Sequence, residues 1–135
     1  MPKITLDATI DNLSAVQAFL EEVLEAAGCP MAKQLQIQVA AEEIYVNVAS
    51  YAYAPETGSV TVSAEISGDP AELTLVFTDS GVPFDPVART DPDVSLPAAE
   101  RGIGGLGILL AKKNTDEMLY EYTDGKNILT MKKKL

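Results

Sequence analysis

The clearest pattern along the chain is helical and lies between residues 35 and 53. Apolar side chains recur there at spacings of three and four, which gathers them on one helical face: Ile37, Ala40, Ala41, Ile44, Val48 and Tyr51. Glu43 and Asn47 stand one turn apart beside that face, so a carboxylate and a carboxamide are expected in a partly buried position. The pair suits binding of a hard cation or deprotonation of a hydroxyl; the alternative is that neither residue has a functional role.

A second helical pattern covers residues 13–27. Asp11 or Asn12 is placed to cap its first turn. Gly28 suits the position just past the end of a helix, and Pro30 cannot continue one, so the two helices are expected to be separate.

Two segments, 3–8 and 59–66, alternate between polar and apolar residues, as strands do when they bury one face, and three more are predicted as strands: 73–78, 118–122 and 128–132. A third helix is predicted to begin near residue 103 and to continue to Lys113. A sheet with one apolar face needs a cover, and the helices can supply it. The sequence therefore predicts an α+β fold, a two-layer α/β sandwich whose mixed, mainly antiparallel sheet is covered on one face by three helices.

Composition narrows the class of protein. The 135 residues, 47% of them apolar, suit one globular domain over 1–135, while the net charge of -10 disfavours binding to nucleic acid or an anionic membrane. With no leader and no long apolar run, the chain is expected to be soluble and cytoplasmic. Cys29 is the only cysteine, which excludes an intramolecular disulfide. There is no histidine, so any catalysis must use carboxylates, hydroxyls, lysine or a bound metal.

An aspartate, Asp79, ends the third predicted strand and is followed by the sequence Ser-Gly-Val-Pro-Phe-Asp-Pro. Aspartate at such a place is commonly a turn residue. It is also a good acceptor for an exocyclic amine such as that of adenine, and Gly81 would let the backbone approach a flat ring closely.

A glycine cluster at residues 102–107 directly precedes the third helix. Unobstructed N–H groups at the start of a helix suit phosphates. No Gly-Lys-Ser/Thr follows, so the cluster is not a P-loop. Because the protein is acidic, a triphosphate there would also need a cation, for which Glu43 and Asn47 are suitably placed.

Together these motifs resemble those of the GHKL ATPase superfamily and, more closely, of the bacterial anti-sigma-factor serine/threonine kinases. The resemblance covers residues 4–135 and implies the Bergerat-type ATP-binding fold. Residues 43–53 resemble that family's asparagine box, 79–86 its first glycine box, 104–107 its second, and 127–131 its closing strand.

The resemblance implies a role for each matching residue. Asn47 would bind the Mg²⁺ that bridges the triphosphate, and Glu43 would be the general base for a serine or threonine hydroxyl. Asp79 would accept from the adenine amino group, with Gly81 beneath the ring and Thr130 supporting the contact. The other implied nucleotide-binding residues are Pro83, Phe84, Arg101, Gly104, Gly105, Leu106 and Gly107.

The stretch 87–102 would be a mobile ATP lid, from which Arg101, and less surely Arg89, reaches the terminal phosphate. The sequence departs from the family pattern at two places. Tyr51 stands where the family often has histidine, and residues 102–103 are additional to the second glycine box.

The implied function is that of an ATP- and Mg²⁺-dependent serine/threonine protein kinase acting as an anti-sigma factor. It would phosphorylate an anti-anti-sigma partner of the STAS type, sequester a sigma factor and form homodimers. The alternative is a nucleotide-binding partner switch without kinase activity. A third candidate, part of a two-component kinase or a chaperone-like ATPase, is less expected, because the sequence shows no dimerisation helix pair and no phosphoacceptor histidine.

Overall fold

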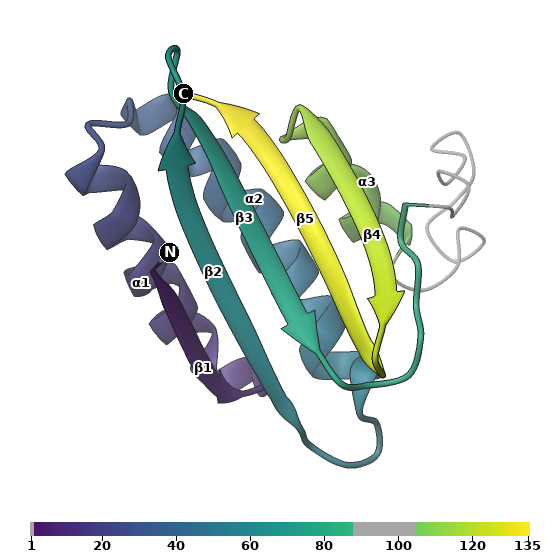
Figure 1. Ribbon diagram of the computed structural model, residues 1–135. Coiled ribbons are helices and arrows are strands. Elements are labelled where there is room, and N and C mark those ends of the chain that lie inside the picture. Colours follow the sequence, from purple (N-terminus) through teal and green to yellow (C-terminus); the bar gives the residue numbers. More distant parts are fainter. Residues whose placement is uncertain (1, 88–104) are drawn as a thin grey trace.

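A single five-stranded sheet forms one layer of the computed structural model, which describes residues 2–87 and 105–135 (Figure 1). The strands are β1 (Lys3–Asp7), β2 (Ser59–Ser67), β3 (Glu72–Asp79), β4 (Glu117–Thr123) and β5 (Lys126–Lys134). Their order across the sheet is β1-β2-β3-β5-β4. All five lie where the sequence predicts strands.

The pairing in this sheet is antiparallel throughout, so the prediction of a mixed sheet is wrong on that point. β3 and β4 do run parallel to each other, joined through the helix α3 (Gly105–Lys113). They are not neighbours, because the tight turn after β4 returns β5 into the space between them.

The helices form the second layer and all lie on one face of the sheet (Figure 1). A short 3₁₀ turn (Ile10–Asn12) leads into α1 (Leu13–Ala26), and α2 (Met31–Asn47) follows. At Val48 the helix widens into a π-helical turn, Val48–Ala52, which the sequence pattern does not reveal. Among the described residues, no helix has the length and apolarity needed to cross a membrane.

The core lies between the layers and is built by residues that alternate along the central strands. Most inward side chains of β2 and β3 are at most 2% exposed and pack against the apolar face of α2. They include Val60, Val62, Ala64, Leu73, Leu75 and Phe77, opposite Ile37, Ala40, Ala41 and Ile44. The hydroxyl of Tyr45, itself fully buried, donates to the Thr9 carbonyl at 2.6 Å and ties α2 to the end of β1.

The end of α1 confirms one prediction, and its start corrects another. Gly28 has φ of +71°, and the N–H of Cys29 reaches back to the Leu24 carbonyl at 3.0 Å, which closes the helix. At the start of α1, neither Asp11 nor Asn12 caps through its side chain. The Asn12 amide instead donates to the Asp7 carbonyl at 2.8 Å, because β1 ends close beside it.

Candidate functional site

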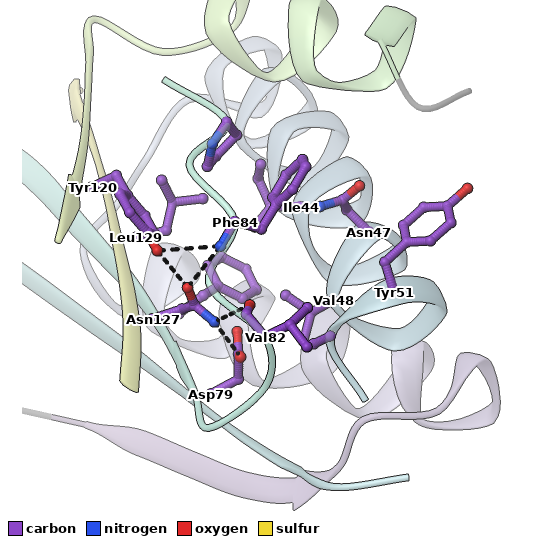
Figure 2. A pocket seen from close by; sticks show the side chains of 13 residues that line it. Ile44, Asn47, Val48, Tyr51, Asp79, Val82, Phe84, Tyr120, Asn127 and Leu129 are labelled. Atoms are coloured by element: carbon purple, nitrogen blue, oxygen red, sulfur yellow. Dashed lines mark hydrogen bonds between the residues drawn. The ribbon is translucent and has the colours of Figure 1, made fainter. Parts of the chain in front are cut away.

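A pocket opens between the last turn of α2 and the ends of β3 and β5 (Figure 2). Its cavity volume is about 70 Å³. One water needs only about 10–15 Å³, so the pocket admits a larger group. Most of its lining residues are apolar, which suits the binding of a flat ring. The residues that line it are Ile44, Asn47, Val48, Tyr51, Ala52, Phe77, Asp79, Val82, Phe84, Pro86, Tyr120, Asn127 and Leu129.

Asp79, at the end of β3, supplies the acidic group of this pocket and is only 6% exposed. Its Oδ1 accepts two hydrogen bonds of 2.9 Å, from the Gly81 N–H and from the Asn127 side chain. Within residues 2–87 and 105–135, its Oδ2 has no hydrogen-bond partner. A nearly buried carboxylate is stabilised by hydrogen bonds, so this oxygen offers an acceptor to a ligand in the pocket.

Asn127, on β5, is a pocket residue that the sequence interpretation missed. It stands opposite Asp79 in the β3–β5 register, and its Nδ2 also donates to the Val82 carbonyl at 2.9 Å. The strand alternation could have identified it, because Asn127 shares the helix-facing side of β5 with Leu129 and Met131.

Thr130, expected to support the adenine contact, does not lie at the pocket. It pairs with Val76 and Leu119 on the other face of the sheet, the face that carries no helix. The expectation fails because side chains alternate along a strand, so a shift by an odd number of residues moves a position to the opposite face.

The loop after β3 is held against the π-helical turn. The Val82 N–H donates to the Ala52 carbonyl at 2.9 Å, and a side chain on Gly81 would collide with the same carbonyl. The Tyr53 hydroxyl accepts from the Ser80 N–H at 2.7 Å and donates to the Ser59 carbonyl at 2.6 Å. The glycine at position 81 thus permits the close approach of the Ala52 backbone, and the approach of a flat ring to Gly81 stays a prediction.

Glu43 and Gly107 lie next to each other, although they are 64 positions apart in the chain. A Cβ added to Gly107 would come within 2.5 Å of Glu43 Oε2, so the glycine makes room for the carboxylate. Asn47, one turn further along α2, lines the pocket. The fold therefore brings the asparagine box beside the glycine-rich start of α3.

The remaining predicted site residues divide into three groups. Phe84 lines the pocket, whereas Pro83 is not among the lining residues. Gly105 opens α3, and Leu106 belongs to its first turn. Three further predictions, Arg89, Arg101 and Gly104, lie outside the described residues, as does nearly all of the segment predicted to be a lid.

Two tyrosines complete the pocket. Tyr51, 47% exposed, stands on the wall formed by the π-helical turn (Figure 2). Burial raises the pKa of Tyr120 above its ordinary value, against a smaller opposing effect of its hydrogen bond with the Phe84 backbone. Tyr120 therefore keeps its proton at neutral pH, and its O–H donates to Asn127 Oδ1 at 2.5 Å.

Comparison with known proteins gives one family. The chain matches the model of the histidine kinase-like ATPase domain over residues 6–133. No curated protein matches it. Among solved structures, it is similar to the crystal structure of the RsbU and RsbW domains of Rv1364c from Mycobacterium tuberculosis, with 21% identity and a TM-score of 0.69. The match covers 100% of this chain and 33% of that one, so it spans a third of the larger protein and shows a shared fold.

Proposed function

Because the chain belongs to the histidine kinase-like ATPase family, we propose that its pocket binds ATP with the adenine ring against Asp79. The observation that carries this proposal is Asp79 Oδ2, an acceptor on the wall of an apolar pocket to which no group in the described part of the chain donates. An exocyclic amine is the donor that such an oxygen lacks, and the apolar walls supply contact area for the ring.

For the phosphates, we propose the start of α3 together with Asn47 and Glu43. Open N–H groups at a helix start bind phosphate oxygens. Within the described part of the chain, no group of three acidic, cysteine or histidine residues can hold a metal ion. A Mg²⁺ ion fits this donor set nevertheless, since it binds through few protein oxygens and completes its shell with water and nucleotide phosphates. Asn47 would supply the carboxamide oxygen.

We further propose that the protein is a serine/threonine kinase in which Glu43 is the general base. Phosphoryl transfer needs positioning and charge neutralisation more than a covalent protein group, so a chain without histidine can perform it. The room left by Gly107 beside the carboxylate supports this role. The hydroxyl would belong to an anti-anti-sigma protein of the STAS type, whose modification leaves a homodimer of this chain free to sequester a sigma factor in the cytoplasm.

The second candidate is a partner switch that binds nucleotide without transferring phosphate. The same pocket serves both functions, because the residues that would bind the base are separate from Glu43. Only an assay of transfer distinguishes the two.

The first experiment is calorimetric titration of the wild-type protein and of Asn47→Ala with ATP and ADP, with and without Mg²⁺. We expect binding that Mg²⁺ strengthens, and we expect Asn47→Ala to lose the Mg²⁺-dependent part while retaining the fold. Absence of binding by the wild-type protein under all conditions would contradict the proposal and favour a nucleotide-independent interaction domain.

The kinase proposal is tested with Glu43→Gln, Mg-ATP and a STAS-type partner from the same organism. Nucleotide affinity should survive, because Glu43 does not line the pocket, whereas transfer should fall by about 10²-fold or more. Transfer by Glu43→Gln at the wild-type rate would show that another group is the base. Nucleotide binding without transfer by the wild-type protein would favour the partner switch.

A further inference from the structure

The side chain of Asn127 uses its whole hydrogen-bonding capacity at the end of the pocket. Nδ2 donates to Asp79 Oδ1 and to the Val82 carbonyl, both at 2.9 Å (Figure 2). Oδ1 accepts from the Phe84 N–H at 3.2 Å and from the Tyr120 hydroxyl at 2.5 Å. With an exposure of 6%, the amide has little water to replace any of these partners.

The chemistry of the partners fixes the orientation of this amide. The Val82 carbonyl can only accept and the Phe84 N–H can only donate, so Nδ2 must face Val82 and Oδ1 must face Phe84. In that orientation the amide necessarily presents a donor to Asp79. A side chain with only a hydroxyl cannot satisfy this set of partners, and a carboxylate would place oxygen against the Val82 carbonyl and Asp79.

The consequence reaches the oxygen that faces the pocket. Two donors, from Asn127 and from Gly81, occupy Asp79 Oδ1 and fix the carboxylate plane. Oδ2 is then the one oxygen available to a ligand, and it can only accept while the carboxylate is ionised. Tyr120 lies behind the amide and holds it from the side of β4.

We propose that Asn127, supported by Tyr120, is a positioning residue that sets the base specificity of the pocket by directing Asp79 Oδ2 at the amine on C6 of the purine. This inference rests on the proposed ATP binding. It assigns the discrimination between purines to an amide on β5 that does not itself contact the base. Asn127→Leu keeps the branched shape of the side chain and removes its donors and acceptor.

The test measures the affinity of each variant for ATP and for purine riboside triphosphate, which differs from ATP only by lacking the C6 amine. A hydrogen bond to a charged acceptor should make the wild-type protein prefer ATP by roughly 10- to 100-fold. In Asn127→Leu we expect this ratio to fall to within about threefold of one, because Oδ2 is no longer held, while the analogue keeps most of its affinity. Tyr120→Phe should lower the ratio in the same direction by a smaller factor.

Asn114→Leu is the matched control, since its half-buried amide lies at the end of α3 and, within residues 2–87 and 105–135, donates only to the Leu110 carbonyl. It should leave the ratio unchanged. If Asn127 had a purely structural role, the variant would lose affinity for both ligands equally and the ratio would not change. An unchanged ratio in Asn127→Leu therefore overturns this inference but not the proposed function. If Asn127→Leu does not fold, an unchanged ratio in Tyr120→Phe has the same meaning. A wild-type protein that binds both ligands equally overturns it as well, and one that binds neither overturns the proposed function too.

Discussion

The ladder between β3 and β5 has two distinct regions on its helix-covered face. In the middle, Leu75 stands opposite Met131 and Phe77 opposite Leu129, and all four side chains are nearly buried. At the pocket end the next pair is Asp79 and Asn127, which are equally inaccessible but polar. The backbone pairing is the same in both regions, so the difference lies in the side chains alone.

This difference suggests a division of one buried ladder between stability and the proposed binding. Apolar pairs stabilise the fold because their surface is removed from water, which contributes about 25 cal/mol for each Å² of apolar surface buried. A buried polar pair is tolerated only when its hydrogen bonds are made. Asp79 and Asn127 satisfy each other and the loop after β3, and one acceptor oxygen is left over. The proposed binding site lies where the apolar pattern of the sheet stops.

The largest effect on the fold is expected from the middle of the ladder. Leu75→Ala removes a side chain that is 1% exposed and should lower the free energy of unfolding by about 2–5 kcal/mol. Urea denaturation measures the loss. Under conditions where the variant is folded, its preference for ATP over purine riboside triphosphate should equal that of the wild-type protein. A changed preference would mean that the apolar middle of the ladder also affects nucleotide binding.

Gly107→Ala should separate activity from stability beside Glu43. The added Cβ would displace Glu43, whose flexible side chain can move aside, so phosphoryl transfer should fall roughly 10- to 100-fold. Stability should stay level or rise by up to about 1 kcal/mol, because alanine favours a helix over glycine. The double variant Glu43→Gln with Gly107→Ala should transfer phosphate no more slowly than Glu43→Gln alone. If the two losses of transfer rate multiply instead, Gly107 acts independently of Glu43.

A smaller effect is expected from Tyr120 at alkaline pH. Burial raises the pKa of Tyr120 in the folded state above its ordinary value, so the folded state holds this proton more tightly than the unfolded state. The contribution to stability is complete below pH of about 10 and is lost as the pH rises through the folded pKa. Urea midpoints at pH 8 and pH 10.5 should therefore differ less in Tyr120→Phe than in the wild-type protein.

Tyr122→Phe, at a position that is 46% exposed, is the control for that comparison. It should leave the difference between the two midpoints at its wild-type value. An equal reduction in both variants would mean that the alkaline loss is not specific to Tyr120.

The smallest effect is expected from Thr130→Val. Thr130 is three residues from Asn127 but points to the other face of the sheet. Its replacement should change ATP affinity by less than about twofold and stability by less than about 0.5 kcal/mol. Calorimetry with ATP provides the check. A tenfold loss of affinity would mean that the binding site extends through the sheet.

The sequence predicted much of this architecture from local signals. The sequence predicted every strand, two of them by alternation, and Gly28 with Pro30 separated α1 from α2. These predictions succeeded because strand alternation and helix termination depend on residues close together in the chain. The Asn12 cap failed because a partner outside the helix, the Asp7 carbonyl, competes for its amide.

The site was predicted less completely. Asp79 and Asn47 do line one pocket, but Thr130, expected from the resemblance, lies on the other face of the sheet, and Asn127 lines the pocket. The choice between them depends on which face of β5 meets the helices, and the alternation of Leu129 and Met131 already carried that information. The π-helical turn had no such signal, because its apolar residues fit an ordinary helix equally well.

By itself, the sequence determined the segments that form strands and helices, which side of each is apolar, and the residue types available for chemistry. The tertiary structure decided which elements and residues lie next to each other: β5 lies between β3 and β4, Asp79 stands opposite Asn127, and Glu43 lies beside Gly107. Periodicity is a property of neighbouring residues and survives in the unfolded chain. Contacts between residues 48 or 64 positions apart exist only after the two layers have packed, since packing is what aligns the strands and brings α3 against α2.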